Sequence, residues 1–168
     1  NFSVSSSDYI PFMAIDINSG NVDATGNVIG SSTGTSSIDL TYTAGSGEAD
    51  SYGIYVNSSG TVALSNNTVG SITTHSNPTG FSHSFTGIFK TYQSGTITVS
   101  ENLIGSLTEH LSIQAATDNT SSAAQNVYGI KSESVGINNI TNNRIANLYS
   151  AHNYQYANNG QVVGISVN

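Results

Sequence analysis

The sequence predicts an all-β solenoid of about four to five stacked coils, and three observations lead to this fold class. The pattern N-x-[IV]-[GA] occurs four times, at spacings of 40, 35 and 41 residues. Segments in which apolar and polar residues alternate precede each copy, and a period of two indicates β-strands. Helical periodicity is nearly absent, and only residues 108–116 (TEHLSIQAA) have a pattern that would suit a short helix.

Each repeat is expected to contain three short strands and a longer connecting segment. In the second repeat the strands are Gly53–Val56, Thr61–Ser65 and Thr68–Thr73, and the Asn, Gly and Ser residues between them suit tight turns. Repeats start near residues 14, 53, 87, 129 and 164, so we expect residues 1–168 to form a single segment. The connecting segments are Thr33–Ser51, Thr74–Phe85, Glu109–Val127 and Ser150–Val162.

Stacking places equivalent apolar residues above one another and so buries a face that one coil alone would leave exposed. Four interior columns are predicted: Val22, Val62 and Ile97; Ala24, Leu64, Val99 and Ile140; Ile29, Val69, Ile104 and Ile145; Ile15, Ile54, Ile88, Ile130 and Ile165. Lys90 shares its register position with Val56. Because a buried, unpaired ammonium group is costly, we expect the strand to end at Phe89 and Lys90 to point to solvent.

Four asparagines open the repeated pattern and are the clearest structural candidates: Asn27, Asn67, Asn102 and Asn143. Adjacent coils lie about 4.8 Å apart, so stacked amides can bond to one another. A buried amide is costly unless it is hydrogen-bonded, and a stacked neighbour supplies the partner. We therefore predict an asparagine ladder with a structural role.

Short strands, apolar columns in register and turn asparagines together resemble the right-handed parallel β-helix, the solenoid of pectate-lyase-like proteins, over residues 13–168. The resemblance implies the same asparagine ladder at this turn. Open strand edges at the ends of a solenoid invite aggregation, and the sequence shows no capping element at either end. We therefore expect an uncapped fragment of a longer array; the alternative is that a partner chain caps the ends.

Composition excludes several functional classes. Ser, Asn, Thr and Gly make up 83 of 168 residues, and three Lys/Arg stand against ten Asp/Glu. So few cations cannot neutralise a nucleic-acid backbone, and no apolar run is long enough for membrane insertion. The absence of cysteine excludes a disulfide scaffold and a thiol nucleophile.

An enzyme is not expected, and neither is a cofactor. No two acids share a column in adjacent repeats, and Glu48 and Asp50 are interpreted as a solvated loop tip. The weak candidate for a metal site is a stripe of histidines after successive coils, His75, His110 and His152. Alternatives are a carbohydrate-active lyase or hydrolase, or an ice-binding solenoid, for which Thr96 and Thr98 form one T-x-T rank.

Adhesion is the predicted function, because Tyr- and Asn-rich loops on a rigid scaffold suit binding, although they could instead pack on the solenoid. Repeats rich in Asn, Ser, Thr and Gly but poor in charge and cysteine resemble the giant surface adhesins of bacteroidete-type bacteria. That resemblance implies a secreted, extracellular stalk or filament that contacts surface glycans, cells or sister chains. The candidate binding-loop residues are Tyr42, Phe81, His83, Tyr149, Tyr154 and Tyr156.

Overall fold

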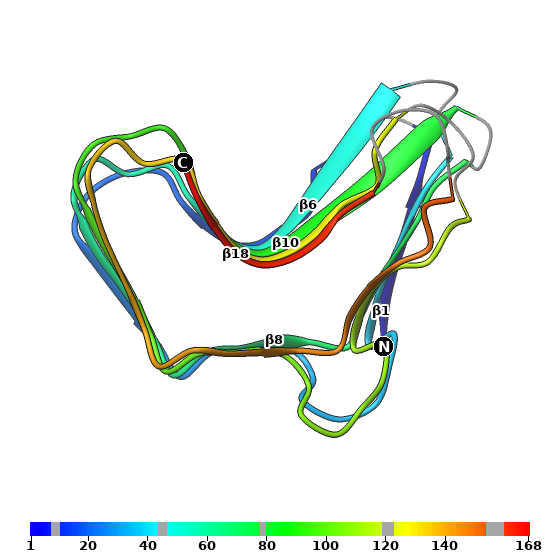
Figure 1. Ribbon diagram of the computed structural model, residues 1–168, viewed down its shortest axis with the longest axis horizontal. Coiled ribbons are helices and arrows are strands. Elements are labelled where there is room, and N and C mark those ends of the chain that lie inside the picture. The colour runs from blue at the N-terminus through cyan, green and yellow to red at the C-terminus, as the bar shows by residue number, and fades with distance from the viewer. Residues whose placement is uncertain (8–10, 44–46, 78–79, 119–122, 154–159) are drawn as a thin grey trace.

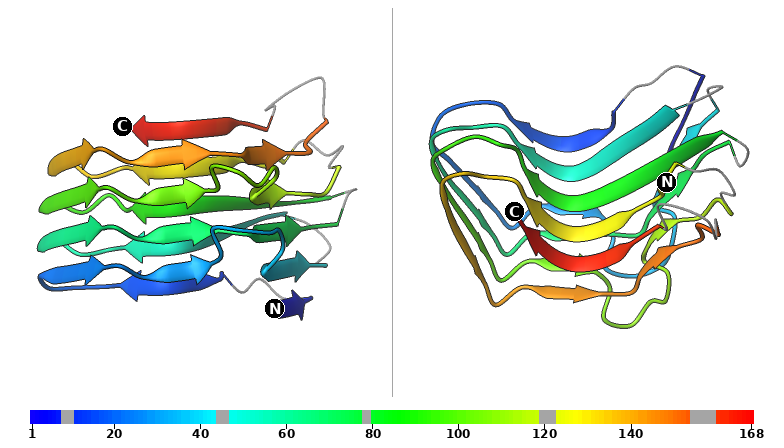
Figure 2. Two further views of the ribbon diagram at one scale, coloured as in Figure 1. Left: turned by 90° about the horizontal axis from the view of Figure 1, so that it is seen from below. Right: turned by 45° about the horizontal axis from the view of Figure 1, so that its top comes forward.

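The chain is a stack of parallel β-coils in the computed structural model, which describes residues 1–7, 11–43, 47–77, 80–118, 123–153 and 160–168 (Figures 1 and 2). Four sheets, A to D, run along the stack, and all their strand pairings are parallel. Each coil passes through sheets B, C, D and A in turn and winds to the right. The right-handed parallel solenoid predicted from the sequence is confirmed.

The described strands group by sheet as follows. Sheet A contains β1 (Phe2–Ser6), β5 (Ile38–Tyr42), β9 (Ile72–His75), β13 (Ile113–Ala115) and β17 (Leu148–Ser150). Sheet B contains β2 (Met13–Ile17), β6 (Gly47–Val56), β10 (Phe81–Lys90), β14 (Val127–Ser132) and β18 (Val162–Val167). Sheet C contains β3 (Val22–Thr25), β7 (Thr61–Ser65), β11 (Thr96–Ser100) and β15 (Ile137–Thr141). Sheet D contains β4 (Val28–Gly30), β8 (Thr68–Gly70), β12 (Leu103–Gly105) and β16 (Arg144–Ala146).

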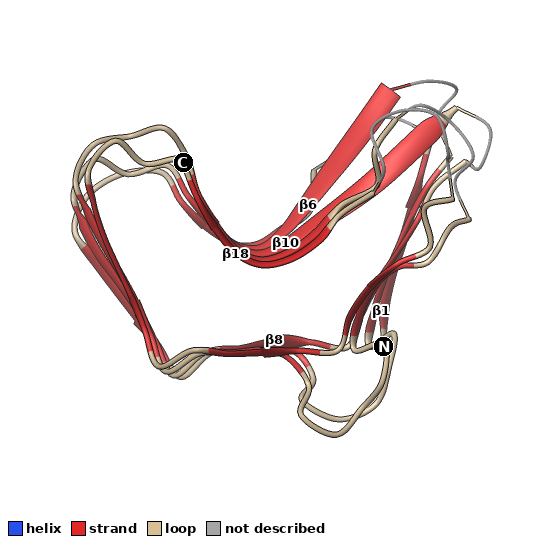
Figure 3. Ribbon diagram, in the orientation of Figure 1, coloured by secondary structure: helices blue, strands red, loops and turns tan. Residues whose placement is uncertain are grey.

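A complete coil has four strands rather than the predicted three. The expected strand Thr68–Thr73 is divided at Ser71, whose φ of 57° turns the chain out of sheet D into sheet A. The segments interpreted as connections therefore contain β5, β13 and the first half of β6 and β10, and the other strands of sheet A after β1 end within them (Figure 3). The short helix expected over residues 108–116 is also wrong, because Leu111 adopts a φ of 56° and the chain then enters β13.

The four predicted apolar columns are present in register. Val22 pairs with Val62 and Ile29 with Val69, and the equivalent pairings continue up the stack. Ile54 and Leu64 are fully buried in the resulting core. Among the described residues, no helix is long and apolar enough to cross a membrane.

Lys90 lies inside the coil, contrary to the expectation that it points to solvent. Strand β10 continues through Lys90, which pairs with Val56 and is only 1% exposed. Its Nζ donates hydrogen bonds to the carbonyl oxygens of Thr91 (3.3 Å) and Gln93 (3.2 Å), and these carbonyls at the corner replace water. Burial lowers the pKa of Lys90, because desolvation disfavours the ammonium form.

A column of glycines shapes sheet B. A Cβ at Gly87 would lie 2.6 Å from the Gly129 carbonyl oxygen and 2.6 Å from Ile104 Cγ2, and Gly53 is similarly crowded against Val69. Only glycine lets the backbone approach the opposite sheet so closely. Sheet B consequently bends into the coil, and its outer surface is concave (Figure 1).

Two loops project from alternate coils, at residues 31–37 and 106–112, and explain the alternating repeat spacings. Both connect sheet D to sheet A, and they bulge from the same corner in Figure 1. The Ser106 hydroxyl donates to the Ser32 carbonyl oxygen at 2.7 Å, so the loops touch across the coil between them. The structural period is therefore two coils.

Candidate functional site

The concave outer side of sheet B is the strongest candidate site, because it gathers aromatic side chains from successive coils. Tyr52 of β6 lies in register with Thr86 of β10 and Tyr128 of β14. Beyond the glycine bend, Tyr55 lies in register with Phe89 and, in the next coil, with Lys131. We call Tyr52, Tyr55, Phe89 and Tyr128 the aromatic face.

The rings of this face pack against one another. Tyr52 stacks on Phe89 with ring centroids 5.2 Å apart and an interplanar angle of 17°. Tyr55 meets Tyr52 edge-on at 5.0 Å and Phe89 at 5.7 Å. Lys131 Nζ lies 5.3 Å from the Tyr128 centroid and 5.4 Å from the Phe89 centroid, which is cation–π geometry. The aromatic face is thus continuous across neighbouring coils.

A hollow of about 170 Å³ adjoins the rings, and its edge is acidic. Glu48 and Asp50 lie two residues apart on β6, so both project from the outer side of sheet B. They flank a strand-bound hollow and are not the loop tip expected from the sequence. The other lining residues are Tyr52, Ser84, Thr86, Phe89, Asn126, Tyr128 and Lys131.

The electrostatic environment perturbs two groups here. Burial in the concavity, and next the charge of Glu48, raise the pKa of Asp50, while Lys131 acts in the opposite direction. Burial, followed by repulsion from Asp16, raises the pKa of the Tyr55 phenol. Lys131 Nζ also lies 2.7 Å from Glu133 Oε1, so its charge is shared with a carboxylate outside the hollow. The site therefore combines aromatic rings with an excess of carboxylates.

The predicted binding-loop residues lie elsewhere. Tyr42 and Phe81 are buried in β5 and β10, with ring centroids 4.6 Å apart, and His83 is buried beside them. Tyr149 is exposed, but it belongs to strand β17 rather than to a loop. Tyr154 and Tyr156 lie outside the described residues. The described members thus either pack in the interior or decorate sheet A.

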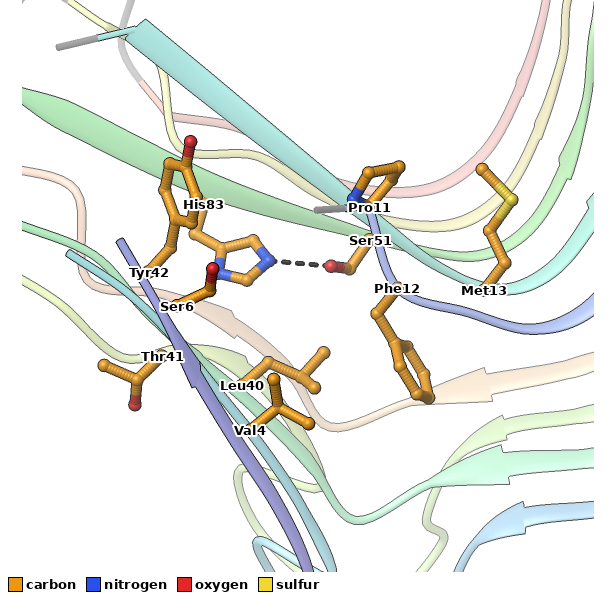
Figure 4. Close-up of a pocket in the computed structure, with 10 residues that line it drawn as sticks. All are labelled: Val4, Ser6, Pro11, Phe12, Met13, Leu40, Thr41, Tyr42, Ser51 and His83. Carbon is orange, nitrogen blue, oxygen red and sulfur yellow. Dashed lines mark hydrogen bonds between the residues drawn. The ribbon is translucent and has the colours of Figure 1, made fainter. Parts of the chain in front are cut away.

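A partly open pocket of about 250 Å³ lies between sheets A and B beside this cluster (Figure 4). Leu40 and Phe12 line it, and a buried Ser51–His83 pair borders it at 2.7 Å between Oγ and Nε2. His83 Nδ1 lies 3.3 Å from the His75 carbonyl oxygen, so Nδ1 carries the proton and Nε2 accepts from Ser51. Burial lowers the pKa of His83 to about 4, which keeps the ring neutral. The hydrogen bond between Ser51 and His83 thus gives both buried side chains a partner.

The three histidines of the predicted stripe are not brought together. His75 ends β9 and lies 3.3 Å from Asp39, whereas His110 lies in the loop 106–112 at another corner. His152 follows β17, and burial lowers its pKa. Across the described ranges of the chain, no group of three or more potential metal ligands is present.

The four asparagines do form a hydrogen-bonded ladder. Nδ2 of Asn27 donates to Oδ1 of Asn67, that of Asn67 to Asn102, and that of Asn102 to Asn143, each at 2.9 Å. Each acceptor oxygen also receives the backbone N–H of the residue below, at 2.9–3.0 Å. A second ladder, which sequence reasoning missed, joins Ser37, Ser71 and Ser112.

The aromatic face was also missed, although the sequence contains its signal. The motif Tyr-Gly-Ile at Tyr52 and Tyr128 marks both the bend and the outward ring. Comparison with known proteins adds no relative: no family model matches the chain, and no significant match occurs among the curated proteins or the solved structures. The functional argument therefore rests on the geometry of sheet B.

Proposed function

We propose that this chain is a non-enzymatic segment of an extracellular bacterial stalk or filament that binds carbohydrate on its aromatic face. The observation that carries the proposal is the cluster of aromatic rings from successive coils on the concave side of sheet B. Aromatic rings offer large apolar area with little conformational entropy to lose, and the hollow beside them offers hydroxyl and amide groups from Ser84, Thr86 and Asn126. Sugars present both matching surfaces, namely C–H faces and hydroxyls.

The stalk role is supported by the construction of the coils. Parallel strands, a continuous apolar core and the asparagine ladder connect each coil to its neighbours. Such a solenoid extends by adding repeats, so a long array presents many outward-facing side chains along its length. Low charge and the absence of cysteine agree with the resemblance to secreted surface adhesins. Sister chains are a further proposed partner of the same surface.

Calorimetric titration with neutral and charged oligosaccharides tests the binding proposal. Tyr128→Ala removes a half-buried ring of the aromatic face and is expected to weaken binding about tenfold. Tyr149→Ala is the matched control, because Tyr149 is exposed on sheet A. Equal affinities for the two variants would move binding away from sheet B, and no binding of any oligosaccharide would refute the proposal.

A carbohydrate-active enzyme is the second candidate, and one observation favours it. Glu48 and Asp50 flank the hollow, and the raised pKa of Asp50 suits a general acid. Incubation with oligosaccharides followed by measurement of reducing ends tests this candidate. Release of reducing ends that disappears in Asp50→Asn would establish hydrolysis. An unchanged substrate would refute the enzyme and leave binding as the proposed function.

Ice binding has less support from the outer face of sheet C. Thr96 pairs with Thr61 and with Ile137, and Thr98 pairs with Ala63 and with Asn139. The T-x-T rank of β11 therefore has no equal in its neighbouring strands.

A further inference from the structure

We infer that the ligand of the aromatic face is cationic, specifically an oligosaccharide that carries free amino groups. This inference rests on the proposed carbohydrate function and adds the chemical class of the sugar. It is carried by the charge distribution over the outer side of sheet B, together with the half-buried tyrosine rings that lie among the charges.

The described residues around the aromatic face carry an excess of negative charge. Asp16 is in register with Tyr55, while Glu48 and Asp50 line the hollow. Lys131 is the one cation there among the described residues, and Glu133 pairs with it at 2.7 Å. Four carboxylates against one ammonium leave three negative charges without a partner of opposite sign on this face.

Concavity increases the effect of those charges. A cleft lined by one sign of charge concentrates the field and attracts counter-ions of the opposite sign. Asp50 lies in the concavity beside Glu48, and the opposing charge of Lys131 does not prevent its pKa from being raised. A ligand ammonium at this edge would relieve the repulsion between the two carboxylates, whereas a uronate would add to it.

Aromatic rings favour the same sign of charge. The face of a tyrosine or phenylalanine ring attracts a cation, and Lys131 already exploits this attraction toward Tyr128 and Phe89. Tyr52 and Asp50 both line the hollow, so a sugar that contacts Tyr52 there would hold an amino group near Asp50. Ser84 and Asn126 offer hydrogen-bonding groups in the same hollow.

The face thus offers aromatic rings, hydrogen-bonding groups and unpaired carboxylates, and an amino sugar matches all three. Its ring C–H face stacks, its hydroxyls bond to amides and hydroxyls, and its ammonium groups pair with carboxylates. A cationic peptide meets the charge requirement, but it lacks the ring C–H faces and the dense hydroxyl groups that suit the tyrosines and the polar lining of the hollow. A neutral sugar meets the stacking requirement and leaves Glu48 and Asp50 unpaired.

The test compares three hexasaccharides that differ in charge: a glucosamine hexamer, its N-acetylated form and a galacturonic acid hexamer. Titration at a pH of about 6 keeps carboxylates ionised and amines protonated. We expect the glucosamine hexamer to bind at least about tenfold more tightly than the acetylated hexamer, a difference of about 1.4 kcal/mol. The galacturonic acid hexamer should bind most weakly, and raising the salt concentration should weaken the glucosamine complex.

Variants locate the charge effect. The double variant Glu48→Gln and Asp50→Asn should lower affinity for the glucosamine hexamer about tenfold and leave affinity for the acetylated hexamer unchanged. Asp23→Asn is the matched control, because Asp23 is an exposed strand carboxylate on sheet C and its substitution should change neither. Melting curves of all variants confirm that they are folded.

The outcomes distinguish failure of the cationic inference from failure of the carbohydrate function. Equal binding of the glucosamine and acetylated hexamers overturns the cationic inference and leaves the carbohydrate function standing. Tighter binding of the galacturonic acid hexamer does the same. No binding of any hexamer overturns both, and equally tight binding of hexalysine overturns the assignment to a sugar.

Discussion

Asn102→Leu tests the energetic role of the asparagine ladder. Asn102 is 1% exposed, and its Oδ1 accepts both the backbone N–H and the side-chain amide of Asn67 at 2.9 Å. Its Nδ2 donates to the carbonyl oxygens of Leu64 and Ser100 and to Asn143. Leucine is close in size but can make none of these bonds.

The expected loss follows from the groups left unpaired. Two donors on Asn67, itself buried, would lose their acceptor, and each unsatisfied buried group costs about 1–3 kcal/mol. Burial of the leucine side chain offsets about 1–2 kcal/mol of this cost. The free energy of unfolding should therefore fall by about 3 kcal/mol, which lowers the melting temperature by about 6–12 °C at this chain length.

Asn27→Leu is the matched control for this experiment. Asn27 is half-buried and contributes only its Nδ2 bond to Asn67, while its backbone N–H keeps the same acceptor. That variant should lose less than about 1 kcal/mol. Chemical denaturation monitored by circular dichroism measures both. A loss for Asn102→Leu no larger than that for Asn27→Leu would refute the reasoning.

Three further substitutions test other features of the coil. Lys90→Met should stabilise the protein at neutral pH by about 1 kcal/mol, because it removes a buried ammonium. The folded pKa of Lys90 is lowered, so the unfolded chain binds more protons at alkaline pH. Unfolding experiments should therefore show that the stability of the wild-type protein rises with pH toward about 10.4. The same rise of stability with pH in Lys90→Met would contradict this. Gly87→Ala should cost more than about 2 kcal/mol in denaturant unfolding, since its Cβ would overlap Ile104 and Gly129, and a neutral effect would contradict the packing. Glu101→Gly should raise the melting temperature by a few degrees, because Glu101 has a φ of 58°, which glycine adopts without the strain of a Cβ. A lower melting temperature would show that the Glu101 side chain contributes more than the backbone strain costs.

The repeat and the interior columns could be predicted from the sequence because both depend on local periodicity. Val62 and Ile97, 35 residues apart, pair in the structure as their common pattern predicts. The asparagine ladder could also be predicted from the sequence, since asparagine recurs at the same turn of each repeat. Such features need only the strand period and the coil length.

Sheet A was not predicted, because its strands lack a uniform apolar pattern. Thr74 points into the core where Leu40 stands one coil earlier, so a buried threonine conceals the alternation. Lys90 was misplaced for a related reason: burial depends on two backbone carbonyls at a corner, which no sequence pattern reports.

The aromatic face depends on a break in strand alternation. Gly53 and Ile54 are both buried, so the glycine bend shifts the phase and directs Tyr52 and Tyr55 to the same outer surface. A strict period of two would place Tyr52 and Tyr55 on opposite sides of the sheet. Knowing the bend requires knowing what the missing Cβ would meet, namely Val69 of the opposite sheet.

Mapping a bound glucosamine hexamer by NMR tests the central claim most directly. Ring resonances of Tyr52, Phe89 and Tyr128 should shift on titration, because these rings form the aromatic face. Tyr92 and Tyr149 are exposed at other places on the coil and should not shift. Shifts confined to Tyr92 or Tyr149, with the aromatic face unchanged, would contradict the assignment of carbohydrate binding to sheet B.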